Sequence, residues 1–175
     1  MSCEPFLERF GELTLKETRS VTVFENHPAL PADEYGLIEL YCNDEACDCR
    51  RVMFDVISKK RNVSVAVVAY GWENASFYRK WFRGNDEATA RLAIQEMVGL
   101  NLNSASHQSE LAPAILKMIR GILQDPAYVI RIKRHYRMFK EMVDPGQFRK
   151  PSAEFPTPAL QKSKKRHHPR ASGNG

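Results

Sequence analysis

The chain has 175 residues and a formal net charge of +5; 43% of its residues are hydrophobic and 27% are charged. This is the composition of one globular domain with a tail. The longest apolar run, residues 63–70, is interrupted by Ser64 and is far shorter than the roughly 20 residues that a membrane span needs. The sequence therefore excludes a transmembrane helix, and we expect no membrane partner.

The first ten residues bring acidic side chains early. They lack the basic start, apolar middle and small-residue cleavage site of a secretory signal. We therefore expect a cytoplasmic protein. In a reducing compartment, four cysteines are expected to be metal ligands, reactive thiols or core residues, and not structural disulfides.

Apolar residues alternate with period two in the first half of the chain, which predicts strands. Two strands over residues 52–57 and 63–69 are joined by the polar residues 59–62, as in a hairpin. Residues 37–42 form a third strand, and residues 21–24 add a fourth at an edge. We predict a three- or four-stranded antiparallel sheet.

The second half has a period near 3.6, which predicts about four helices. The last one begins with Asp125 as N-cap and Pro126 at the first helical position. Because strands come first and helices follow, we predict an α+β fold whose helices pack on one face of the sheet. The helical stretches are residues 77–82, 90–98, 111–122 and 125–143.

The composition changes at residues 144–146. From residue 145 on, the chain has five prolines, two basic clusters and only two aromatic residues. Such a segment cannot bury enough apolar area to offset an ordering entropy of roughly 1–2 kcal/mol per residue. We predict a single α+β domain over residues 1–144, with a cysteine loop at 42–49, and a disordered basic, Pro-rich tail over residues 145–175.

Three of the four cysteines, Cys42, Cys47 and Cys49, fall within eight residues of a polar loop between two predicted strands. A C-x4-C-x-C turn can bring three thiolates to one point at little entropic cost, and Zn²⁺ is the usual metal of such sites. The spacing matches none of the common ferredoxin patterns, which disfavours an iron–sulfur cluster. We predict a structural zinc site in this loop.

A structural zinc site usually has a fourth protein ligand. His135 is the first candidate because it lies on the last predicted helix, near the point where this helix should meet the sheet. The alternative is a partly buried histidine that bonds to a backbone carbonyl. His107, His27 and Cys3 are further candidates. The predicted zinc ligands are Cys42, Cys47, Cys49 and His135.

Other functions of the same cysteines stay open. They can be ordinary core residues, or reversible ligands of a thiol-based metal or redox sensor. A zinc-dependent, hydrolase-type enzyme would keep an open coordination position for water, with Asp48 or His135 as acid and base. Three thiolates make the metal a poor Lewis acid, and no P-loop, dinucleotide fingerprint, nucleophile elbow or HExxH motif is present. The sequence therefore favours a non-enzymatic function, and we assign no catalytic residue.

Positive charge gathers at the C-terminal end. Residues 131–175 carry twelve Lys or Arg against three acidic residues, whereas the first 130 residues have an excess of acidic residues. A basic strip on the last helix, together with the tail, gives salt-dependent affinity for nucleic acid. A solvated charged face is the alternative. The strip consists of Arg131, Lys133, Arg134, Arg137 and Lys140.

Two segments resemble a family of uncharacterised bacterial proteins, some of which are related to proteins with the SEC-C zinc motif. They are YCx4CDCRR at residues 41–51 and RHYxMFK at residues 134–140, and the resemblance covers about residues 35–142. It implies a cysteine-rich bacterial domain with no assigned reaction. The SEC-C motif itself, with its Cys-x-Cys-Gly-Ser start, is absent from this chain.

Together these observations predict a cytosolic binding or scaffolding domain with a structural zinc site and a nucleic-acid or protein partner. A zinc-dependent enzyme and a thiol-based metal or redox sensor are the alternatives.

Overall fold

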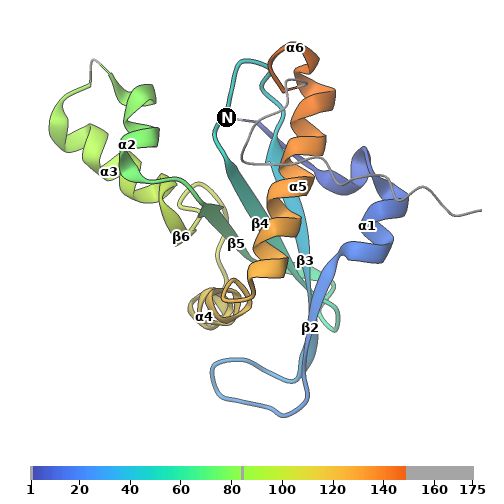
Figure 1. The fold of residues 1–175 in the computed structure, drawn as a ribbon. Coiled ribbons are helices and arrows are strands. Elements are labelled where there is room, and N and C mark those ends of the chain that lie inside the picture. Colours follow the sequence, from blue (N-terminus) through green and yellow to red (C-terminus); the bar gives the residue numbers. More distant parts are fainter. Residues whose placement is uncertain (1, 84, 149–175) are drawn as a thin grey trace, which may run out of the picture.

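The structure is a computed structural model that describes residues 2–83 and 85–148. Six strands form one antiparallel sheet in the order β1-β3-β4-β5-β6, and β2 pairs with the part of β3 that β1 leaves free (Figure 1). The strands are β1 (Cys3–Pro5), β2 (Arg19–Val23), β3 (Asp33–Cys42), β4 (Arg51–Ser58), β5 (Val63–Gly71) and β6 (Gly99–Leu102).

Helices α4 (Ala112–Ile122) and α5 (Pro126–Val143) pack against this sheet, and α5 lies in front of it in Figure 1. The chain also forms two short 3-10 helices, η1 (Phe6–Glu8) and η2 (Arg79–Phe82). The α-helices are α1 (Gly11–Glu17), α2 (Ala75–Tyr78), α3 (Glu87–Met97), α4 (Ala112–Ile122), α5 (Pro126–Val143) and α6 (Pro145–Phe148).

The core lies between the sheet and the helices. Alternate residues of β3 and β4 are buried, as period two requires, and Phe54 stacks on Tyr128 of α5. Full burial of one such large apolar side chain contributes about 1.5–3 kcal/mol to stability. The predicted α+β class is confirmed, but six strands replace the predicted three or four. The described residues form six α-helices in place of the predicted four or so, and β6 lies between α3 and α4.

Two glycines, Gly99 and Gly71, allow α3, β5 and β6 to come close together. Helix α3 ends where Gly99 adopts a φ of 67°, a left-handed conformation that reverses the chain into β6. The end of α3 lies very close to β5. A Cβ atom on Gly71 of β5 would be only 2.0 Å from the carbonyl oxygen of Met97. Only glycine at position 71 permits this approach.

The hairpin between β4 and β5 forms at the predicted connection, residues 59–62, with Asn62 at a φ of 52°. Asp33 fastens this hairpin to β3. Its carboxylate accepts hydrogen bonds from the Ser58 hydroxyl at 2.5 Å and from the backbone N–H groups of Glu34 and Lys60. Although burial opposes it, these bonds hold the pKa of Asp33 below its usual value.

The predicted start of the last helix is confirmed, because the Asp125 side chain accepts a hydrogen bond from the N–H of Ala127 at 3.0 Å. Helix α5 ends at Val143, and the short helix α6 follows beyond the predicted domain boundary. Most of the predicted tail, residues 149–175, lies outside the described residues. In the part of the chain that the structure describes, no helix combines the length and apolarity needed to cross a membrane.

Candidate metal centre

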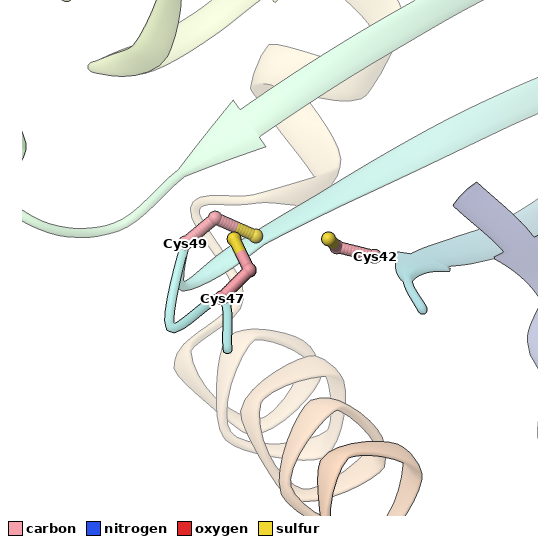
Figure 2. A group of neighbouring side chains, drawn as sticks. All are labelled: Cys42, Cys47 and Cys49. Atoms are coloured by element: carbon pink, nitrogen blue, oxygen red, sulfur yellow. The ribbon is translucent and has the colours of Figure 1, made fainter. Parts of the chain in front are cut away.

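The cysteine loop connects the end of β3 to the start of β4. Asp44 shapes it, because its side chain accepts a hydrogen bond from the N–H of Ala46 and its carbonyl accepts one from the N–H of Cys47. This turn folds the chain back, so that the sulfur atoms of Cys47 and Cys49 lie opposite that of Cys42 (Figure 2). Local sequence therefore brings the three thiols together.

The three sulfur atoms lie within 4.8 Å of one another, and the exposed fractions of Cys42, Cys47 and Cys49 are 2%, 9% and 1%. In a tetrahedral zinc site with Zn–S bonds of about 2.3 Å, two sulfur atoms are about 3.8 Å apart. A small contraction would therefore satisfy the geometry. The three predicted cysteine ligands are together, and they can hold a metal ion.

Hydrogen bonds among the three thiols shift their pKa values in opposite directions. Hydrogen bonds from the Cys47 and Cys49 thiols lower the pKa of Cys42. The same contacts, together with burial, raise the pKa of Cys49 well above its usual value. A divalent cation would replace the protons that these sulfur atoms share.

Lys140 of α5 reaches the same loop from the other side. Its side chain is fully buried, and the ammonium donates hydrogen bonds to the carbonyl oxygens of Cys42 at 3.3 Å and Asp44 at 2.6 Å. Its positive charge also lowers the pKa of Cys42. The sequence placed Lys140 on an exposed basic strip, but the structure buries it beside the cysteines.

Tyr136 is a second link between α5 and the loop. Its hydroxyl donates to the Asp48 carboxylate at 2.9 Å and accepts from the N–H of Arg50 at 3.3 Å. Arg50 has a left-handed φ of 45°, and its guanidinium pairs with Asp48 and Glu73. These contacts hold an unusual backbone conformation directly after Cys49.

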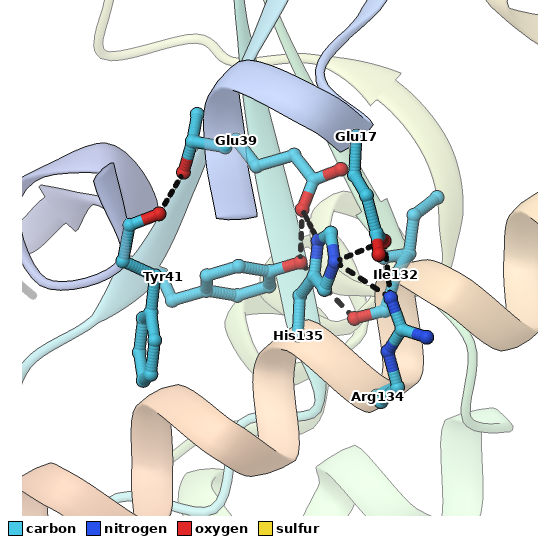
Figure 3. Close-up of polar contacts among 8 residues, drawn as sticks. Glu17, Glu39, Tyr41, Ile132, Arg134 and His135 are labelled. Carbon is cyan, nitrogen blue, oxygen red and sulfur yellow. Dashed lines mark hydrogen bonds and ion pairs between the residues drawn. The ribbon is translucent and has the colours of Figure 1, made fainter. Parts of the chain in front are cut away.

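His135 lies in a different cluster, shown in Figure 3. Its Nδ1 is 2.7 Å from a carboxylate oxygen of Glu39, its Nε2 is 3.0 Å from one of Glu17, and Phe6 stacks on its ring. Tyr41 donates a hydrogen bond to the same oxygen of Glu39 at 2.8 Å. The structure does not bring His135 to the three cysteines. The alternative was a partly buried histidine bonded to a backbone carbonyl, but the partners of this ring are two carboxylates.

Among the other candidates for a fourth ligand, His27 and His107 are exposed, and neither belongs to the sulfur cluster. Cys3 lies directly opposite Cys42 in the pairing of β1 with β3. Burial, and then the nearby Cys42, raise the pKa of Cys3 to about 11. The sequence carries no signal for this position of Cys3, because a strand of three residues has no visible period.

The basic side chains of α5 do not form one exposed strip. Arg134 pairs with Glu17, and Arg137 pairs with Glu141 one helical turn away. Lys133 lies over the ring of Trp72, and Lys140 is buried. The structure therefore shows no continuous exposed basic strip along this helix, and a nucleic-acid partner stays a prediction.

The chain matches no protein-family model, no curated protein and no solved structure. The resemblance of residues 41–51 and 134–140 to a bacterial family therefore stays a prediction. Within the structure, these two segments lie against each other, through Tyr136 with Asp48 and Lys140 with Cys42.

Proposed function

We propose that this protein is a zinc-stabilised binding or scaffolding domain, in which Cys42, Cys47 and Cys49 hold one structural Zn²⁺. The observation that carries the proposal is the group of three buried sulfur atoms within 4.8 Å of one another. Thiolates are soft ligands that favour Zn²⁺, whereas Mg²⁺ and Ca²⁺ prefer oxygen.

Cys3 is the proposed fourth ligand. Residues directly opposite each other in an antiparallel pair have Cβ atoms about 4.5–5.5 Å apart on the same face of the sheet. Cys3 and Cys42 are such a pair. A rotation about the Cα–Cβ bond of Cys3 would direct its sulfur toward the group and close a four-thiolate site.

The charge of the surroundings supports this set of ligands. Zn²⁺ with four thiolates carries a net charge of −2, which is costly to bury without compensation. Lys140 lies beside the loop, and the positive charge of Arg51 acts on Cys3. These two cations offset the charge of the centre.

The role that we propose for the metal is structural. It would join β1, the end of β3 and the cysteine loop, and the loop in turn holds α5 through Tyr136 and Lys140. Burial of the three sulfur atoms leaves little access for a substrate. A closed site of this kind favours a binding domain over the enzyme or sensor alternatives.

The test is metal analysis of the untagged full chain with matched variants. We expect about one zinc per chain in the wild type and almost none in the Cys47→Ser, Cys49→Ser double variant. Zinc content below about 0.2 per chain in the wild type would contradict the proposal, because a structural site binds its metal tightly.

The Cys3→Ser variant tests the fourth ligand separately. After Co²⁺ replacement, the wild type should give the absorption of a four-thiolate site, with weaker sulfur-to-cobalt charge transfer in the variant. Identical spectra would remove Cys3 from the site and leave the three-cysteine centre in place.

A further inference from the structure

A cavity of about 400 Å³ opens at the other end of α5, where the first turns of this helix meet the end of α1 and the start of β2. Three arginines line it, Arg19 of β2 and Arg131 and Arg134 of α5, together with Tyr128. The cavity is separate from the cysteine loop, so an inference about it does not depend on the metal.

The guanidinium groups converge on one aromatic ring. The Cζ atoms of Arg19 and Arg131 lie 5.4 Å and 4.8 Å from the centre of the Tyr128 ring. Arg134 follows Arg131 by three residues, so both project from the same side of the helix. Three positive charges in so small a space repel one another unless anions offset them.

Two carboxylates also line the cavity, but both have other partners. Glu17 contacts Arg134 and the buried ring of His135. Asp125 caps the helix, and its second oxygen is 4.0 Å from Arg19. The charges of Arg19 and Arg134 are therefore met, at least in part, by groups of the protein itself.

Arg131 is different. In the described part of the chain it forms no ion pair, and its buried Nε and one buried Nη have no hydrogen-bond partner. The buried hydroxyl of Tyr128 also lacks a well-formed hydrogen bond, although Arg131 is its neighbour. Burial raises the pKa of Tyr128, so this hydroxyl stays protonated and can donate. Buried donors without acceptors are costly, and a bound anion would satisfy them.

We propose that this cavity binds a phosphate group, with Arg131 as the main ligand and Arg19, Arg134 and Tyr128 around it. The planar guanidinium fork matches two oxygen atoms of a phosphate, and a tetrahedral anion has enough oxygens for several forks at once. The positive end of the α5 dipole adds to the attraction. Because Nε and one Nη of Arg131 are covered, its side chain would have to rotate toward the cavity for these two nitrogens to reach the anion.

The test measures binding of inorganic phosphate to the full chain by calorimetry and by shifts of amide resonances. We expect one saturable phosphate per chain, with amide shifts confined to the start of α5, the end of α1 and β2. Arg131→Gln should weaken binding about tenfold or more, because it removes charge-assisted hydrogen bonds. Lys133 lies two residues further along α5, over the ring of Trp72, and does not line the cavity. Lys133→Gln removes a positive charge from the same helix, so it is the matched control and should leave binding unchanged.

A second arm distinguishes the source of the phosphate. A single-stranded oligonucleotide of mixed sequence replaces inorganic phosphate, at low and high salt. Binding of the oligonucleotide alone, weakened by Arg131→Gln and by salt, identifies a nucleic-acid backbone. Binding of inorganic phosphate alone identifies a small phosphorylated ligand.

Two results would overturn the proposal. The first is that neither probe binds. The second is that Arg131→Gln and Lys133→Gln bind as well as the wild type does. Thermal unfolding of each variant verifies that the folded chain is compared, and Arg19→Gln serves as a second cavity variant if Arg131→Gln unfolds. None of these results depends on the zinc content, so failure here is distinct from failure of the metal centre.

Discussion

The two ends of helix α5 differ in whether their buried hydrogen-bond donors have acceptors. Toward its C-terminus, Tyr136 and Lys140 donate buried hydrogen bonds to the cysteine loop. Toward its N-terminus, Arg131 and Tyr128 carry buried donors that the described residues do not satisfy. Satisfied buried groups fix a structure, whereas unsatisfied ones require something from outside the chain. The difference separates a structural end from a ligand-binding end.

A buried polar cluster lies between the two ends. His135 contacts Glu39 of β3 on one side and Glu17 of α1 on the other. These contacts hold α5 against the sheet midway between the cysteine loop and the arginine-lined cavity. We therefore expect changes at one end to have little effect at the other, and the predictions below test that independence.

The largest effect is expected for Lys140→Met. The substitution leaves the carbonyl oxygens of Cys42 and Asp44 without their buried donor and removes a cation from the metal centre. Each buried carbonyl oxygen that is left without its donor costs about 1–3 kcal/mol. Denaturant unfolding should show that loss, and zinc content should fall. Lys133→Met is the control and should change stability by no more than about 0.5 kcal/mol.

His135→Leu should cost about 3 kcal/mol, because Glu39 then stays buried without one of its two partners. Zinc content should remain at the wild-type value, since His135 lies outside the sulfur cluster. Metal analysis of the folded variant decides the matter. Loss of zinc with retained fold would make His135 a ligand and would end the separation of the middle of α5 from its C-terminal end.

Asp33→Asn should have the smallest effect, about 1–2 kcal/mol at neutral pH, because it weakens hydrogen bonds to a carboxylate. The pKa of Asp33 is lowered on folding. Its contribution is therefore fully present above the unfolded pKa of about 3.9 and disappears as the pH falls through the folded value. The free energy of unfolding should therefore be measured for wild type and variant at pH 7 and at pH 3. We expect the difference between the two proteins to be larger at pH 7. An equal difference at both values would contradict this assignment.

Much of the fold follows from local patterns in the sequence. Strands β3 and β4 alternate clearly, and α5 starts at a recognisable cap. The cysteine cluster is equally local, because a single turn brings Cys47 and Cys49 back to Cys42. Features decided by a few neighbouring residues are therefore predictable.

The rest depends on contacts between distant parts of the chain. Lys140 meets Cys42 from 98 positions away, and His135 meets Glu39 from 96 positions away. A helical wheel shows which residues share a face with Lys140. It does not show that the cysteine loop packs next to the apolar face of the helix and buries this lysine. Strand β1 is too short for a period, so the position of Cys3 beside Cys42 could be seen only in the assembled sheet.

The most direct test of the metal centre is X-ray absorption at the zinc edge on the untagged full chain, purified without added metal. We expect about one zinc per chain, bound by sulfur atoms only, with Zn–S distances of about 2.3 Å. Zinc bound mainly by oxygen or nitrogen, or a protein that is folded and free of zinc, would contradict this expectation.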